Sequence, residues 1–267
     1  MNLLIVGRGK VGRGLERALR SAEGFSVATA GRRPSAAALR EADVVVLAVV
    51  DEAIRSMAEA IAARLPERSV VLHCAGARGP EELEACARRG AATAVMHPLV
   101  SFPSTKKSPS LKDATFTISG APRAVRAARA IARACGARVI LGAGTDPAYH
   151  AAAALVANGA AALAFAGVSI LSAIGFERRN AERAMAGLLR SVADNVAELG
   201  VPQALTGPIA RGDAATIAGH RKALRRLGLP LLNAYDALGP VILQCARSAG
   251  LRDEQVSAIQ RAFQSRN

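Results

Sequence analysis

The chain has 267 residues, of which 51% are hydrophobic and 21% charged, and this composition excludes an intrinsically disordered protein. Its formal net charge of +14 would suit nucleic acid, an anionic membrane or a phosphorylated small molecule. Aromatic residues make up only 3% of the chain and no basic run contains interleaved aromatics, which argues against binding of single-stranded nucleic acid.

The first part of the chain alternates between apolar runs and helix-like segments. Strands without polar alternation, joined through helices, are typical of a parallel sheet covered on both faces. The sequence therefore predicts an α/β fold with a doubly wound, mainly parallel sheet. The expected strands are 2–6, 26–30, 43–49, 69–73, 93–96, 116–119 and 138–141, and the expected helices are 10–21, 51–64, 80–89 and 122–135.

Strand signals stop after Gly144, and only helical patterns follow. Breaks rich in glycine and proline separate these helices. We therefore expect a doubly wound domain at 1–145 and an all-helical domain at 146–267. The expected helices of the second domain are 147–174, 181–198, 214–227, 231–249 and 253–263.

One almost uncharged stretch, 151–176, is long enough to cross a bilayer. It is mostly alanine and has no aromatic belt, so a buried central helix explains it better than a membrane span. The four cysteines form no CxxC pair and the four histidines show no ligand spacing. This pattern indicates a reduced, cytoplasmic protein without a metal site.

A glycine motif, GxGxxG, directly follows the first expected strand and opens the first expected helix. In this position Gly7 permits the turn, Gly9 lets a pyrophosphate approach the backbone, and Gly12 lets the helix pack on the sheet. Amide groups at the helix N-terminus then face the anion. The alternative is a plain strand–turn–helix. The loop residues expected to contact a dinucleotide are Gly7, Arg8, Gly9, Lys10, Val11 and Gly12.

The second strand runs into Gly31, Arg32 and Arg33 without a carboxylate. A carboxylate at this position accepts hydrogen bonds from a ribose 2′-hydroxyl and would repel a 2′-phosphate, whereas two guanidinium groups can bind one. The sequence therefore predicts NADP(H) as the cofactor. Solvated surface arginines are the alternative.

The next strands end at residues that we expect near the cofactor. Ligands bind at the carboxyl edge of such sheets, where the fourth and fifth strands place His73 and His97. His97 is expected in the substrate or nicotinamide pocket, and for His73 cofactor binding and a structural role stay equally open. Asp51 is expected to cap a helix, and the loop 101–112 is either an anion-attracting flap or a solvated loop. The third strand is expected to carry backbone past the cofactor at Ala48, Val49 and Val50.

The helical part opens with Asp146 and Pro147, a typical N-cap and first helical residue. His150 then lies in the first turn, where the helix dipole disfavours its cationic form and suits it to act as a base. Asn158 lies within the same stripe of the helix. We interpret His150 as the catalytic acid/base and Asn158 as a substrate or cofactor ligand; the alternative for both is hydrogen bonding to backbone.

These motifs resemble a large superfamily in which a dinucleotide-binding domain precedes a helical one. It includes 6-phosphogluconate dehydrogenase, ketopantoate reductase, pyrroline-5-carboxylate reductase and prephenate dehydrogenase. More narrowly, HPLVSF, DPAYHAAAALVAN, LTGPIARGDAATIAGH and YDALG resemble an uncharacterised family of Rossmann-like NADP oxidoreductases with a C-terminal domain of unknown function. The resemblance to prephenate dehydrogenases implies that His150 abstracts a hydroxyl proton from the substrate. It also implies that His97 corresponds to the histidine of their HPM motif. This chain has Cys74 where the narrow family often has serine.

Further polar residues lie in the helical part. Thr206 and Arg211 could bind a substrate carboxylate, or they could belong to a structural turn capped by Asp213. His220 and Tyr235 are expected to pack within the helical domain.

Together, the patterns predict an NADP(H)-dependent oxidoreductase that moves a hydride to or from a carbonyl or hydroxyl substrate in a cleft between the domains. The long apolar helix suggests a homodimer through the helical domain. Two alternatives stay open: an imine reductase of the pyrroline-5-carboxylate reductase type, and a non-catalytic protein that senses NADP(H).

Overall fold

The computed structural model describes residues 1–104, 106–142 and 146–265. The chain forms two compact units, 1–157 and 158–267. The division between the units falls inside helix α6 (Pro147–Ala173), whereas the boundary expected after residue 145 touches residues outside the described part.

A seven-stranded sheet organises the first unit, with the order β2-β1-β3-β4-β5-β6-β7. Neighbouring strands are parallel except for β5 and β6, which pair antiparallel. The doubly wound, mainly parallel fold expected from the sequence is therefore confirmed. The strands are β1 (Asn2–Val6), β2 (Ser26–Ala30), β3 (Val44–Leu47), β4 (Val70–His73), β5 (Ala92–Leu99), β6 (Thr115–Gly120) and β7 (Arg138–Leu141).

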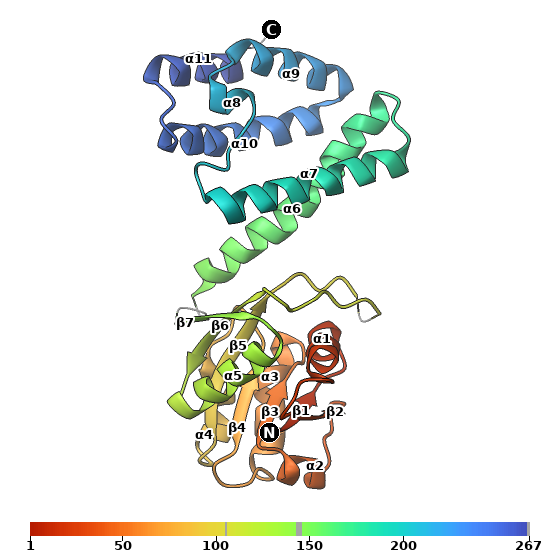
Figure 1. Cartoon of the computed structure of the whole chain (residues 1–267), viewed down its shortest axis with the longest axis vertical. Coiled ribbons are helices and arrows are strands. Elements are labelled where there is room, and N and C mark those ends of the chain that lie inside the picture. The colour runs from red at the N-terminus through yellow and green to blue at the C-terminus, as the bar shows by residue number, and fades with distance from the viewer. Residues whose placement is uncertain (105, 143–145, 266–267) are drawn as a thin grey trace. The chain divides into compact units, whose positions relative to one another are not determined.

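Helices cover both faces of this sheet (Figure 1). Because successive side chains of a strand point to opposite faces, Leu3 and Ile5 of β1 join one core while Leu4 and Val6 join the other. Helices α1 (Lys10–Leu19) and α5 (Pro122–Ala134) pack on the first face, and α2 (Ala36–Glu41), α3 (Ile54–Ala62) and α4 (Glu84–Ala87) pack on the second.

Two local features of this unit differ from the expected elements. Helix α2 was not predicted; it is only six residues long and starts where the Ser35 hydroxyl accepts a hydrogen bond from the amide of Ala38. The helices expected at 51–64 and 80–89 begin as the 3₁₀ turns η1 (Asp51–Ala53) and η2 (Pro80–Leu83). Val50 takes the cap position of η1 without a side-chain bond, so the expectation that Asp51 caps this helix is wrong.

The second unit is helical throughout its described residues, as expected. Its core joins Ile217, Leu243 and Ile259, one from each of the last three helices. Asp213 caps α9 through a hydrogen bond from the amide of Thr216, which confirms its predicted role. The helices after α6 are α7 (Arg178–Leu199), α8 (Pro208–Arg211), α9 (Ala214–Leu227), α10 (Leu229–Ser248) and α11 (Asp253–Gln264).

Helix α6 is apolar but is not covered by the rest of its own chain. Its most apolar 18-residue window has a mean hydropathy of 1.9, and only 6% of that window is buried. By length and composition α6 could cross a membrane. The expectation of a buried central helix is therefore wrong for a single chain, although the predicted helix itself is present.

Arg221 connects the last helices of the second unit. It is only 7% exposed, and its guanidinium makes two hydrogen bonds to the carboxylate of Asp236, at 2.9 and 3.0 Å. It also donates to the carbonyl oxygens of Ala262 and Ser265, both at 2.8 Å. A buried charge with these partners holds α9, α10 and the end of α11 together.

We expect Arg221→Met to lower the free energy of unfolding of the second unit by about 3 kcal/mol, because it leaves Asp236 and two carbonyl groups without their donor. The neighbouring, exposed Lys222→Met is the matched control and should change stability by less than about 0.5 kcal/mol. Urea denaturation followed by circular dichroism measures both. Equal losses in the two variants would contradict this account of the helical core.

Candidate functional site

A cavity of the first unit lies at the carboxyl end of β1 and β3. Strand β1 lies between β2 and β3, so the connections leave β1 and β3 toward opposite faces, and ligands of doubly wound proteins bind at such a point. The cavity has a volume of about 590 Å³. It is lined by Gly7, Arg8, Gly9, Lys10, Val11, Gly31, Arg32, Ala48, Val49, Val50, Asp51, Cys74 and Ala75.

The glycines of the loop after β1 give this cavity its shape. Gly7 has a φ of +121°, and a Cβ atom there would collide with the carbonyl oxygen of Ala48. A Cβ atom at Gly12 would likewise collide with the carbonyl oxygen of Gly7, which explains how closely α1 approaches the loop. At Gly9 a Cβ atom would meet nothing closer than 3.9 Å. The backbone is therefore tightly packed behind Gly9 and open in front of it, as a bound pyrophosphate requires.

The charges around the cavity favour an anion. Helix α1 begins after Gly9 without a side-chain cap, so its first amides have no side-chain acceptor. Arg8, Lys10 and Arg32 add three cationic side chains, and Asp51 adds one carboxylate. These residues fit a phosphorylated dinucleotide: the helix terminus suits the pyrophosphate and Arg32 suits a phosphate at the end of β2.

Three residues expected at the cofactor do not line the cavity. Gly12 is buried behind the loop, and Arg33 is exposed outside the cavity. His73 is fully buried, with Nε2 2.9 Å from the carbonyl oxygen of Gly79 and Nδ1 accepting from the amide of Ala75 at 3.2 Å. Burial lowers the pKa of His73. His73 thus supports the backbone of the cavity wall, which favours the structural alternative.

A second group of polar side chains lies on β5, β6 and the first turn of α6. His97 and Thr117 are directly opposite each other in the antiparallel pair, so their side chains lie on the same face of the sheet. The hydroxyl of Tyr149 bridges them, 2.7 Å from Nδ1 of His97 and 2.7 Å from Oγ1 of Thr117. The three side chains form one hydrogen-bonded chain.

This chain lies beside the wall of the cavity. The ring of His97 packs so closely on Gly76 that a Cβ atom there would come within 2.6 Å of its Cε1 and 2.7 Å of its Nε2. Gly76 directly follows Cys74 and Ala75, which line the cavity. Burial raises the pKa of the Cys74 thiol to about 12, so this side chain stays protonated and offers a neutral surface.

The two histidines near this wall differ in their surroundings. Burial, and to a lesser extent the nearby His150 and His73, lower the pKa of His97 to about 4, so its ring is neutral at pH 7. His150 is exposed on α6, and its ring centroid lies 6.3 Å from that of His97. Burial raises the pKa of Tyr149, which therefore keeps its proton.

Sequence reasoning missed Tyr149 and Thr117. Tyr149 directly precedes His150 and is one of only two tyrosines in the chain, which was a usable signal. Thr117 offered none, because its proximity to His97 depends on the register of β5 and β6. Asp146 caps the start of α6 as predicted: its carboxylate accepts a hydrogen bond from the amide of Ala148 at 2.7 Å.

The other residues predicted for the site belong to the second unit. Asn158 is exposed on α6, and its side chain has no hydrogen-bond partner among the described residues. Thr206 is exposed before α8, and the exposed Arg211 ends that helix. Their roles in substrate binding stay predictions.

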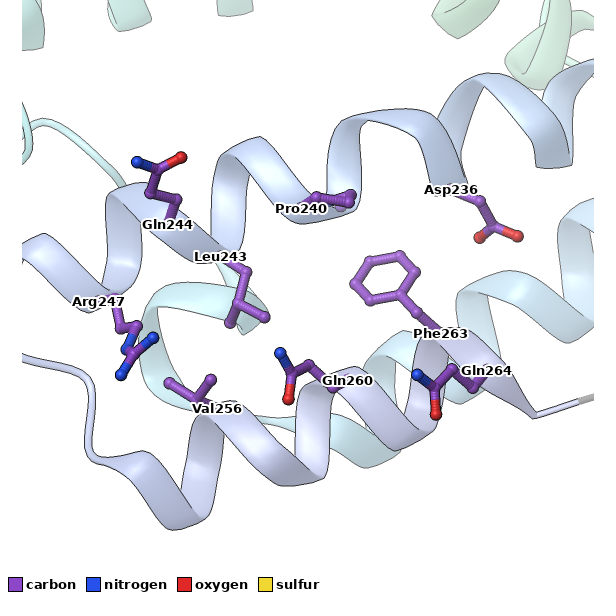
Figure 2. Close-up of a pocket in the computed structure, with 10 residues that line it drawn as sticks. Asp236, Pro240, Leu243, Gln244, Arg247, Val256, Gln260, Phe263 and Gln264 are labelled. Atoms are coloured by element: carbon purple, nitrogen blue, oxygen red, sulfur yellow. The ribbon is translucent and has the colours of Figure 1, made fainter.

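A second cavity, of about 440 Å³, lies between α10 and α11 of the second unit, where side chains of both helices face each other (Figure 2). Leu243, Val256 and Phe263 give it an apolar floor. Its carboxylate, Asp236, is already bound by Arg221, and no histidine lines it. The first cavity carries three cationic side chains, and His97 packs on Gly76 beside its wall, so we place the candidate site there.

Comparison with known proteins identifies part of the chain. Residues 114–242 match the family described as a domain of unknown function, DUF2520. This match begins at β6 of the first unit. No curated protein matches the sequence.

Three solved structures are similar over nearly the whole chain. Protein TM1727 from Thermotoga maritima is 25% identical, with a TM-score of 0.66 over 92% of this chain and 99% of that chain. Protein BF3122 from Bacteroides fragilis, provisionally assigned as an NADP oxidoreductase, is 20% identical, with a TM-score of 0.70 over 91% and 98%. A pyrroline carboxylate reductase from Plasmodium falciparum with NADP bound is 15% identical, with a TM-score of 0.59 over 94% and 98%. These structures confirm the expected fold, and the match at residues 114–242 supports the resemblance to a family with a C-terminal domain of unknown function.

The lowered pKa of His97 predicts a loss of stability in acid. Between pH 6.5 and 4 the unfolded chain binds a proton at this histidine while the folded chain does not, so stability falls as the pH falls through this window. Between pH 7 and pH 5, we expect the free energy of unfolding of His97→Gln to fall by about 1 kcal/mol less than that of the wild type. Urea denaturation at the two pH values measures the difference.

His220→Gln, which removes an exposed histidine of the other unit, is the control and should retain the pH dependence of the wild type. The pKa of His73 is also lowered, so this residue makes stability fall with falling pH in every variant, and part of the pH dependence remains in His97→Gln. A pH dependence that is the same in His97→Gln and the wild type would show that His97 is not the group that titrates.

Proposed function

We propose that this chain is an NADP(H)-dependent oxidoreductase acting on a small carbonyl or hydroxyl compound. One observation carries the proposal: a cavity at the carboxyl end of β1 and β3 combines an open glycine loop, a free helix N-terminus and three cationic side chains. The solved relatives include an NADP-bound reductase of the same fold, which supports the proposal.

Different residues of the cavity bind different parts of the dinucleotide. The amides at the start of α1 bind the pyrophosphate, and Arg8 and Lys10 add charge at the loop. Arg32 binds the 2′-phosphate of the adenosine ribose by charge-assisted hydrogen bonds. Asp51, the carboxylate of the cavity lining, follows β3 and not β2. The end of β2 therefore offers no carboxylate that would repel a 2′-phosphate on the ribose.

The chemistry then lies at the other wall of the cavity. A bound nicotinamide supplies or accepts a hydride. His97, next to Gly76, contacts the reacting group of the substrate, and the exposed His150 exchanges the proton with solvent.

We further propose a second copy of this chain as the partner. Helix α6 is apolar on all sides and mostly exposed, and such a helix is stable in water only when another surface covers it. Helix α7 adds more exposed apolar side chains beside it, and Gly167 lets Met185 of α7 approach α6 closely. A two-fold axis would let each α6 cover the other. The exposed apolar side chains include Leu163 and Phe165 of α6 and Leu188, Val192 and Val196 of α7.

The cofactor assignment predicts the effect of removing one arginine. Arg32→Ala should weaken NADPH binding about 10- to 100-fold and leave NADH binding nearly unchanged, because it removes charge-assisted hydrogen bonds to the 2′-phosphate alone. Arg33→Ala is the matched control, since Arg33 lies outside the cavity, and should change NADPH affinity less than threefold.

Isothermal titration calorimetry with NADPH and NADH measures both variants. Absence of binding heat for either nucleotide with the wild type would sink the whole proposal. Equal losses of NADPH and NADH affinity in Arg32→Ala would refute the role of Arg32 in choosing between them.

The partner assignment predicts the mass of the protein in solution. The wild type should sediment at twice the 27.5 kDa of the chain, and Phe165→Glu should sediment as a monomer because it places a charge on the covering surface. Val241→Glu is the control, since Val241 is equally exposed, at 66% against 67%, but lies on α10. A monomeric wild type, or one soluble only in detergent, would contradict the proposed dimer.

A further inference from the structure

The hydrogen-bonded chain of Thr117, Tyr149 and His97 contains a limited number of protons. The Tyr149 hydroxyl has one hydrogen and two neighbours at 2.7 Å, so it donates to one and accepts from the other. Neutral His97 has one ring hydrogen, on either Nδ1 or Nε2. Only two arrangements are therefore consistent with the geometry.

Acidity decides between them. A phenol is a much stronger acid than a neutral imidazole N–H, and an imidazole nitrogen is a much better acceptor than a phenol oxygen. The favoured arrangement has Tyr149 donating to Nδ1 of His97 and Thr117 donating to the oxygen of Tyr149. The ring hydrogen of His97 must then be on Nε2.

The surroundings of Nε2 make this hydrogen available. Nε2 of His97 has no hydrogen-bond partner among the described residues, and the residue is only partly buried. It lies against Gly76, next to the cavity wall formed by Cys74 and Ala75. An accessible N–H group beside the cavity needs an acceptor.

We infer that Tyr149 positions His97 as a neutral Nε2–H donor. The atom that accepts from this donor in the substrate is then the oxygen of a carbonyl or hydroxyl group, not the nitrogen of an iminium group. This inference rests on the proposed function, and it gives a structural reason for its substrate class and a positioning role for Tyr149. A carbonyl oxygen has lone pairs that accept from Nε2–H, and the bond strengthens as negative charge develops on that oxygen. A protonated imine presents its own N–H and has no lone pair, so two donors would face each other.

The same arrangement separates the roles of the two histidines. His97 keeps its proton and binds the oxygen, so the proton that completes the alcohol comes from another group. His150 is exposed and its ring lies 6.3 Å from that of His97, so we assign it the donation of this proton to the oxygen, after which it regains a proton from solvent. Tyr149 acts only through His97 and is a positioning residue.

The tautomer of His97 tests this directly, with the full chain and without any substrate. Protein labelled with ¹⁵N-histidine is studied by long-range ¹H–¹⁵N NMR, and the His97 signals are assigned from their loss in His97→Gln. We expect a protonated Nε2 and an unprotonated Nδ1. His73 is an internal reference of known tautomer. The carbonyl oxygen of Gly79 can only accept from Nε2 of His73, and the amide of Ala75 can only donate to its Nδ1, so the ring hydrogen of His73 is on Nε2.

Two phenylalanine variants make a matched pair, since each tyrosine of the chain hydrogen-bonds to Nδ1 of one histidine. Tyr149→Phe should shift the His97 nitrogen signals toward a mixture of tautomers. Tyr235→Phe should change the signals of His220 and leave those of His97 as they are. A protonated Nδ1 of His97 in the wild type, or His97 signals unchanged by Tyr149→Phe, overturns the inference.

Turnover tests the substrate class. NADPH oxidation is followed with a panel of short aldehydes and α-keto acids and with a panel of cyclic imines of similar size. We expect turnover of carbonyl compounds, with kcat at least about 10-fold lower in Tyr149→Phe and KM changed less. Turnover of no carbonyl compound overturns the substrate class. A protein that binds no nicotinamide nucleotide refutes the proposed function, and the NMR result for His97 would still stand.

Discussion

The absence of a side chain at Gly7, next to the carbonyl of Ala48, determines where the candidate site can form. It allows the chain to leave β1 at a φ that side chains disfavour and to start α1 at the carboxyl end of β1. The N-terminus of α1 then meets the carboxyl ends of β1 and β3, where the connections diverge to opposite faces. Three cationic side chains gather there because the loop after β1 and the end of β2 are brought to the same edge.

Much of this arrangement could be predicted because its signals are local. The strands of the first unit are buried on both faces, so their apolar runs identify them, and β1, β2 and β7 begin and end at the expected residues. Helix α2 escaped prediction because six residues are too short to show a helical period. The burial of α6 could not be predicted either, since an apolar sequence indicates that a surface will be covered without showing which surface covers it.

Some residues of the candidate site could likewise be predicted from local motifs, and others could not. The glycine loop and Arg32 lie within single short motifs, and the structure places them together at one cavity. The pair of His97 and Thr117 depends on an antiparallel register between β5 and β6, two strands that run parallel to their other neighbours. No motif encodes that register, and Tyr149 reaches the pair from a different element. His73 and His97 were both expected at the carboxyl edge of the sheet, and their burial and hydrogen-bond partners distinguish them in the structure.

Burial also explains why the network around Tyr149 is neutral. A cationic His97 would lose its hydration and would lie near His150, and both effects favour the uncharged ring. An ionised Tyr149 would pay the same desolvation cost. The neutral groups can still orient one another through two short hydrogen bonds, and under the proposed function they would stay oriented as charge develops on a bound oxygen. His150 is exposed and shares no hydrogen bond with this network among the described residues, so the orientation of His97 does not depend on it. The geometry of the network therefore depends on burial and on two hydrogen bonds, and not on a charged side chain within it.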